Sequence, residues 1–163
     1  MNVRILNAPA QPTMTLSVIT RAHQRLADLL DHIQPLLLLA TRWYVSWQFL
    51  KSGYLKFSSW ETTLGLFETE YHVPLLPPHL AAVVGTFGEL FFPVLLVLGL
   101  GGRIGALGLF AVNAMAVISY AHVLLGEGFE AALGQHVLWG FMLAVLVFFG
   151  NGSIGVDRFF GKR

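Results

Sequence analysis

Four long apolar blocks constrain what this chain can fold into. They cover about residues 33–50, 80–100, 104–123 and 131–149. A helix needs ~20 mostly apolar residues to cross a hydrocarbon core of ~30 Å. Because lipid offers the backbone no hydrogen-bond partners, such blocks cross as helices. The sequence therefore predicts an all-α integral membrane protein, with a four-helix bundle over residues 33–163.

The overall composition agrees with a membrane protein. Hydrophobic residues make up 55% of the 163 positions and charged residues only 12%, about half the charged fraction of a soluble domain. The net charge of +1 argues against nucleic acid as a partner. The chain has no cysteine, which excludes disulfides, thiolate chemistry and cysteine-held clusters. The lipid bilayer is therefore the first partner that we expect.

Residues 1–32 precede the first block and differ from it. Pro9 and Pro12 lie in the opening stretch, and we expect residues 1–13 to form a mobile tail. After it, apolar positions recur at helical spacing up to the first block, namely Leu16, Ile19, His23, Leu26, Leu30 and Ile33. This pattern predicts an N-terminal amphipathic helix over residues 15–33, which either lies in the membrane interface or extends the first span into water.

Basic residues near the block ends predict the orientation. Arginines precede the first block, Arg103 lies between the second and third, and more basic residues follow the fourth. In a four-span protein these places share one side, and the positive side faces the cytoplasm. We therefore expect both termini in the cytoplasm. The opposite side holds residues 53–79, which we expect to form a long interfacial loop.

Three polar residues fall near the middle of predicted spans. Arg42, Glu89 and Asn113 occupy the first, second and third blocks. An isolated charge at this depth costs several kcal/mol, about 2.5–3.5 on insertion scales. We therefore predict that Arg42 pairs with Glu89, with Asn113 as a further hydrogen-bond partner. The pair either floors a ligand cavity, with Trp43 and Trp47 as walls, or only fixes the helix register.

A second polar group is expected toward the outer face. His122 ends the third block, and His136 and Trp139 share a face early in the fourth. Histidine at this position favours a proton-coupled site, such as one for a quinone headgroup. The weaker alternative is a metal site of His122, His136 and His79, although their spacing matches no metal motif. The sequence shows no resident cofactor, so quinone is the one cofactor class that we consider.

Several motifs together resemble the DoxX family of small four-span bacterial membrane proteins. The first motifs are FLKSGYLKF after Arg42 in the first block, GTFGEL in the second block and the LGLGGRIGAL turn. They are followed by His122, Trp139 and the closing GNGSIGVDRFF. The likeness covers most of residues 36–160. The polar positions that match the family pattern are Arg42, Lys56, Glu89, His122 and Trp139.

The resemblance implies a bacterial inner-membrane protein with several possible roles. Its relatives include a subunit of a thiosulfate:quinone oxidoreductase, membrane anchors for redox-detoxifying partners, and members of gene clusters for modified metal-binding peptides. We therefore expect a membrane subunit of a redox or stress-response system with a polar, quinone-binding cavity. Its electrons would come from a partner protein in the membrane or periplasm, so any enzymatic activity is that of an oxidoreductase subunit.

Two other roles stay open. One is a non-enzymatic scaffold or assembly factor for partner proteins, including those that mature metal-binding peptides. The other is a transporter component, which with four spans needs a homo-oligomer. Fold resemblance alone does not choose between these roles.

Overall fold

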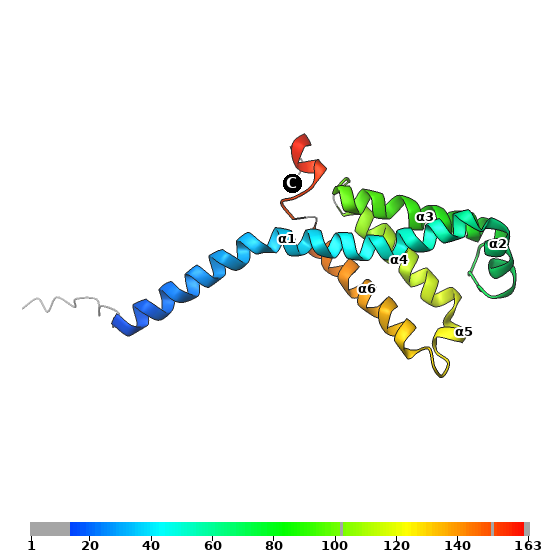
Figure 1. The fold of residues 1–163 in the computed structure, drawn as a ribbon, viewed down its shortest axis with the longest axis horizontal. Coiled ribbons are helices and arrows are strands. Elements are labelled where there is room, and N and C mark those ends of the chain that lie inside the picture. Colours follow the sequence, from blue (N-terminus) through cyan, green and yellow to red (C-terminus); the bar gives the residue numbers. More distant parts are fainter. Residues whose placement is uncertain (1–13, 102, 151, 162–163) are drawn as a thin grey trace, which may run out of the picture. The chain divides into compact units, whose positions relative to one another are not determined.

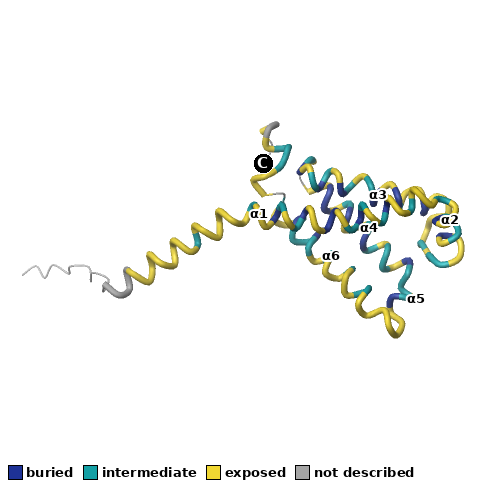
Figure 2. The backbone as a smooth tube through the Cα atoms, in the orientation of Figure 1, coloured by how far each residue is buried: buried dark blue, intermediate teal, exposed yellow. Residues whose placement is uncertain are grey.

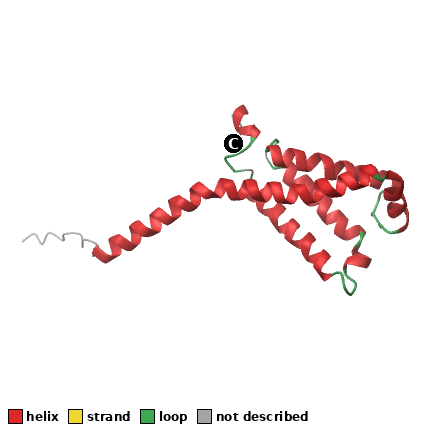
Figure 3. Cartoon of the chain, in the orientation of Figure 1, coloured by secondary structure: helices red, strands yellow, loops and turns green. Residues whose placement is uncertain are grey.

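The structure is a computed structural model that describes residues 14–101, 103–150 and 152–161. The expected tail over residues 1–13 lies outside this part. The described residues form helices and loops without a strand (Figure 3), which confirms the all-α prediction. The elements are α1 Met14–Ser58, α2 Trp60–Thr69, α3 Pro78–Leu98, α4 Ile104–Ser119, α5 Ala121–Leu124, α6 Glu130–Phe149 and the 3₁₀ helix η1 Val156–Phe160 (Figure 1).

The chain separates into two compact units, Met1–Gln34 and Pro35–Arg163, and the boundary falls inside α1. The described part of the first unit is helical where the amphipathic pattern was found. Its apolar side chains are exposed, with Leu26 at 54% and Leu30 at 57%. The place of this helix at a membrane surface stays a prediction.

The second unit has one principal hydrophobic core. Buried residues from α1, α3, α4 and α6 meet in it, so each of the four apolar blocks contributes (Figure 2). These residues are Leu38, Val45, Phe49, Leu96, Ala106, Leu109, Leu143 and Leu146. Four helices therefore share one core.

Two of the described helices are long and apolar enough to cross a membrane. They are α3, with mean hydropathy 2.1, and α6, with mean hydropathy 1.8. The apolar helix α4 is shorter, at 16 residues. A crossing by all four helices of the shared core stays a prediction.

The ends of α3 follow directly from its sequence. Pro78 occupies the first helical turn, where its missing N–H is not needed. At the other end Gly99 adopts φ +67°, and the N–H groups of Gly99 and Leu100 donate to Leu96 and Leu95. This is the Schellman arrangement that glycine allows. The tight turn brings α4 back against α3 in antiparallel contact.

The segment between α1 and α3 differs from the expected loop. α1 continues to Ser58, and α2 follows almost at once. The buried ring of Phe67 on α2 packs against Ala81 and Ala82 on α3, with Trp60 and Leu64 beside it. The prediction of a loop is therefore wrong for residues 53–69, and a loop remains only over residues 70–77. Aromatic residues at helical spacing gave α2 a face to bury.

Candidate functional site

α1 and α3 approach closely at Gly53. A Cβ atom at this position would lie 2.9 Å from the Cβ of Glu89 and 3.0 Å from the side chain of Leu90. Only glycine therefore lets the two helices come together here without a shift. One turn further along α1, Lys56 reaches the same level as Glu89.

Lys56 and Glu89 form an ion pair between the two helices. The Lys56 Nζ donates to both carboxylate oxygens of Glu89 at 2.8 Å, and to the Oγ of Ser52 at 2.8 Å. Glu89 is buried and lies near the middle of α3. Ser52 and Lys56 are four residues apart, so they share one face of α1. Apart from these contacts, Glu89 faces a cavity.

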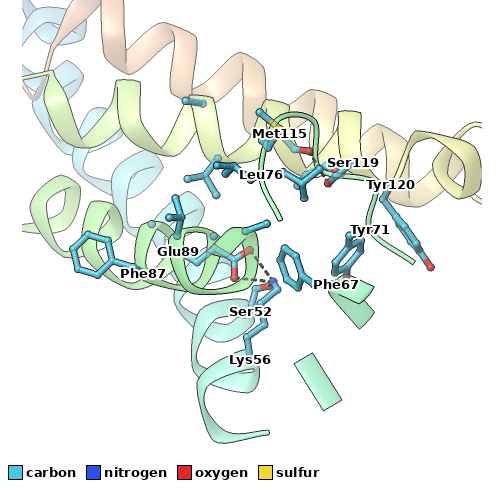
Figure 4. Close-up of a pocket in the computed structure, with 18 of the residues that line it drawn as sticks. Ser52, Lys56, Phe67, Tyr71, Leu76, Phe87, Glu89, Met115, Ser119 and Tyr120 are labelled. Carbon is cyan, nitrogen blue, oxygen red and sulfur yellow. Dashed lines mark hydrogen bonds and ion pairs between the residues drawn. The ribbon is translucent and has the colours of Figure 1, made fainter. Parts of the chain in front are cut away.

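The cavity has a volume of about 520 Å³ and lies among α1, α2, α3 and α4, with contributions from α5 and α6 (Figure 4). Most of its lining is apolar, with small residues such as Gly85, Gly88 and Gly108 on the α3 and α4 sides. The polar side chains of the lining are Ser52, Lys56, Tyr71, Glu89, Ser119, Tyr120 and His136. A mainly apolar space with a few converging polar groups is typical of small-molecule sites.

His136 enters this lining from α6 and is held by Asn113 of α4. The Nδ2 of Asn113 donates to the backbone oxygen of His136 at 3.0 Å. The Nδ1 of His136 lies 2.9 Å from the Oδ1 of Asn113. The ring of Trp139 packs against His136, with centroids 5.1 Å apart, and its buried Nε1 has no hydrogen-bond partner. Asn113 therefore fixes the imidazole, and Trp139 supports it.

An aromatic cluster closes the cavity beside α5. The ring of Tyr71 contacts Phe67 and Tyr120, with centroids 4.9 and 5.0 Å away. The ring of His122 lies 4.7 Å from that of His72. The backbone N–H of His72 donates to the oxygen of Ser119 at 2.8 Å. The segment after α2 is therefore fastened to the end of α4.

Arg42 lies away from the cavity. The residue is 1% exposed, and its guanidinium donates to the backbone oxygens of Leu96 at 2.8 Å and Val97 at 2.6 Å, and to that of Ile154. The first two carbonyls end α3, where a positive charge also meets the negative end of the helix dipole. The predicted pair of Arg42 with Glu89 is therefore wrong.

The closing segment is attached to the same turn by Asp157. Its backbone N–H donates to the oxygen of Gly99 at 3.2 Å, and its Oδ1 accepts from the N–H of Gly101 at 3.1 Å. Gly155 also lies against Gly99, where a Cβ would meet the Cα of Gly155 at 2.7 Å. We call this arrangement of Arg42, the α3–α4 turn and residues 152–161 the C-terminal clasp.

A comparison with protein families decides the family. The family model for DoxX matches residues 37–122, a little more than half of the chain. The chain belongs to the DoxX family. No curated protein and no solved structure matches it. The DoxX match and the two apolar helices support a membrane protein.

The DoxX match is shorter than the likeness expected over residues 36–160. It contains the Lys56–Glu89 pair, Arg42, Asn113 and His122. His136, Trp139 and the closing segment lie beyond it. The candidate site therefore combines residues inside the family match, such as Lys56 and Glu89, with His136 of α6, which lies beyond the match.

The structure brings together only some of the predicted site residues. The cavity is lined by Lys56, Glu89 and His136. Asn113 was expected to bond to an Arg42–Glu89 pair, and it bonds to His136. His122 contacts His72 outside the lining. Trp139 supports His136 from behind. The tryptophans beside Arg42 are not walls of the cavity, since Trp43 and Trp47 are 55% and 56% exposed.

The weaker metal alternative finds no support in the described residues. His79 packs against Trp60 with ring centroids 6.4 Å apart, His122 against His72, and His136 against Trp139. No group of three or more His, Cys, Asp or Glu side chains placed to hold a metal occurs in the described part of the chain.

Four polar lining residues were missed from the sequence: Ser52, Tyr71, Ser119 and Tyr120. Ser52 had a usable signal, because KSGYLK places it four residues before Lys56. Tyr71 and Tyr120 had none, since their approach depends on how the segment after α2 packs on α4.

Proposed function

We propose that this DoxX-family protein is a multi-pass inner-membrane protein that binds a quinone headgroup in the cavity beside Lys56 and Glu89. It then serves as the membrane subunit of a redox or stress-response system, together with a partner protein that exchanges electrons. In this proposal α1, α3, α4 and α6 cross the membrane, and both termini face the cytoplasm.

One observation carries the proposal, namely an ion pair whose carboxylate, Glu89, is buried at half the length of an apolar helix beside a cavity of about 520 Å³. A charge within a membrane span is costly and marks a functional site by default. A buried ion pair adds little stability compared with apolar packing. The mainly apolar lining suits a ligand with a polar ring and a hydrocarbon tail.

The binding experiment uses the full chain in nanodiscs that contain no quinone. Short-chain ubiquinone and menaquinone analogues are titrated against wild type, the double variant Lys56→Met/Glu89→Leu and the control Lys51→Met. Lys51 is an exposed lysine of α1 outside the cavity lining. We expect wild type and the control to bind alike and the double variant to bind at least about tenfold more weakly, a loss of ~1.4 kcal/mol.

Replacing both partners avoids leaving one buried charge unpaired, so the double variant keeps its fold. Absence of binding to wild type, or equal binding by all three proteins, would remove the quinone proposal.

A scaffold function is the second candidate, and the completeness of the ion pair favours it. The ammonium of Lys56 has three protons, and its three acceptors are the Oγ of Ser52 and both oxygens of Glu89. Because the ammonium is satisfied within the protein, the pair can act structurally by joining α1 to α3 without a ligand. Under this function the double variant retains its partner proteins in a pull-down from native membranes.

A further inference from the structure

The hydrogen-bond groups of the cavity are not balanced between donors and acceptors. His136 contributes an acceptor, because its contact with Asn113 places the ring proton on Nδ1. The Nδ2 of Asn113 is assigned by its bond to the backbone oxygen of His136, which only accepts. The other atom of the amide is therefore the oxygen, and it requires a proton on the Nδ1 of His136. The neutral ring then carries its lone pair on Nε2.

The Nε2 of His136 makes no hydrogen bond with the described residues, and the side chain lines the cavity. It is thus an acceptor open to a ligand. Asn113 is a positioning residue here, because it sets which nitrogen accepts without contacting the ligand itself.

Lys56 and Glu89 shift the balance in the same direction. All three protons of the ammonium are directed to Ser52 and Glu89, so Lys56 offers the ligand no donor. Each carboxylate oxygen of Glu89 accepts one bond from Lys56 and has capacity for another. Beside the pair, one donor remains, the hydroxyl proton of Ser52.

Other hydroxyl groups in the lining lie elsewhere. The hydroxyl of Ser119 is directed to backbone oxygens of its own helix, that of Met115 at 2.8 Å. Tyr71 and Tyr120 belong to the aromatic cluster, and Figure 4 shows them on the other side of Phe67 from the ion pair. The polar end of the cavity therefore presents mainly acceptors.

The rest of the cavity indicates where a hydrocarbon tail lies. Val84 and Phe87 on α3 and Met115 on α4 belong to the lining and are 50%, 59% and 39% exposed. The cavity thus continues to the outer surface of α3 and α4. In a membrane that surface meets lipid, so a tail can leave the cavity there without contact with water.

Resting on the proposed function, we infer that the site binds the reduced, dihydroxy form of the quinone in preference to the oxidised form. The hydroxyl groups of a quinol donate to the carboxylate of Glu89 and to the Nε2 of His136. A quinone presents only carbonyl acceptors to these groups and leaves them unsatisfied in a water-poor space. A site built to bind a hydroxyl discriminates strongly against an analogue without one.

The experiment compares the two redox forms of one molecule. A short-chain quinone and its quinol are titrated anaerobically against the full chain in quinone-free nanodiscs. Both ligands have the same tail, so the contribution of the tail to partition into lipid is equal for the two. We expect the quinol to bind at least about tenfold more tightly, ~1.4 kcal/mol in binding free energy.

The matched variants exchange one carboxylate for an amide. Glu89→Gln converts one acceptor oxygen into a donor and is expected to reduce the quinol preference to about threefold or less. Glu61→Gln makes the same change at an exposed position of α2 outside the lining and is expected to keep the preference.

The outcomes separate the two proposals. Binding of neither form to wild type contradicts the proposed function. Binding of the oxidised form equally well or better leaves the proposed function in place and overturns the preference. A quinol preference that Glu89→Gln leaves unchanged also overturns the inference, because the acceptors would then not be its cause.

Discussion

The backbone of Gly53 lies so close to Glu89 that a Cβ atom on Gly53 would come within 2.9 Å of the Glu89 Cβ. The helix contact that places Lys56 opposite Glu89 therefore depends on the missing side chain. The Cβ of Glu89 is fixed by its own backbone and cannot rotate away, and the Cδ2 and Cγ of Leu90 lie at 3.0 Å from the same position.

We predict that Gly53→Ala destabilises the protein and displaces the ion pair. Overpacking at a helix contact costs typically about 1–3 kcal/mol, and the separation of α1 from α3 weakens ligand binding as well. Thermal unfolding in detergent measures the first effect, and the titration in nanodiscs measures the second. The control is Gly65→Ala on α2, where a Cβ meets nothing within 4 Å and alanine is expected to stabilise the helix by up to about 1 kcal/mol. Equal stability of both variants would contradict the close contact.

Arg42→Lys is predicted to loosen the C-terminal clasp. Lysine has no planar fork, so it cannot serve the oxygens of Leu96, Val97 and Ile154 together. We expect a loss of ~2 kcal/mol or more in unfolding free energy, since buried acceptors lose a charged donor.

Limited proteolysis is the measurement that localises this effect. Cleavage within residues 152–161 should accelerate in Arg42→Lys before the helices are cut. The same exchange at Arg25, which is exposed on α1 and outside the clasp, should change neither the stability nor the cleavage pattern. A resistant closing segment in Arg42→Lys would show that Asp157 alone holds it.

We predict that Asn113→Leu allows the neutral ring of His136 to adopt both tautomers. Without the amide, the Nδ1 proton loses its acceptor and the backbone oxygen of His136 loses its donor. The ring ¹⁵N chemical shifts of His136 should show a protonated Nδ1 and an unprotonated Nε2 in wild type, and a mixture of tautomers in Asn113→Leu. Quinol binding should fall about tenfold in the variant. A wild-type spectrum with the proton on Nε2 would refute the assignment.

Tyr71 provides a prediction at alkaline pH. Burial raises the pKa of Tyr71 above its usual value of 10.0, and the nearby Tyr120, Glu89 and Glu70 raise it further. The folded protein therefore holds this proton more tightly than the unfolded chain. Its contribution to stability is complete below the unfolded pKa of ~10, and it is lost as pH rises through the folded pKa.

The free energy of unfolding, measured from about pH 8 to about pH 12, tests this sign. Wild type should lose stability above pH ~10 more steeply than Tyr71→Phe, which has no phenol to ionise. Parallel curves for the two proteins would show that the ionisation of Tyr71 is not linked to folding.

The helices of the shared core were predictable because apolar blocks of span length leave the backbone few alternatives. The limits of the first block were the weak point. Leu50 ends its apolar run, yet α1 continues to Ser58, since Gly53 and Lys56 find partners on α3. Helix ends set by tertiary contact are not visible in hydrophobicity alone.

The ionic partners were predicted wrongly for the same reason. Counting depth from a block that ends at Leu50 placed Arg42 opposite Glu89. With the true length of α1, the antiparallel contact brings Arg42 to Leu96 and Lys56 to Glu89. Backbone oxygens as partners of Arg42 had no signal in the sequence, because every residue supplies one.

The C-terminal clasp has a consequence for how the protein is made. Arg42 precedes its acceptor at Ile154 by 112 residues, so on the order of ten seconds of synthesis separate the two at ~5–20 residues per second. During that interval the guanidinium has no contact with Ile154. The order of translation thus leaves Arg42 dependent on other partners, such as water, until Ile154 has been synthesised.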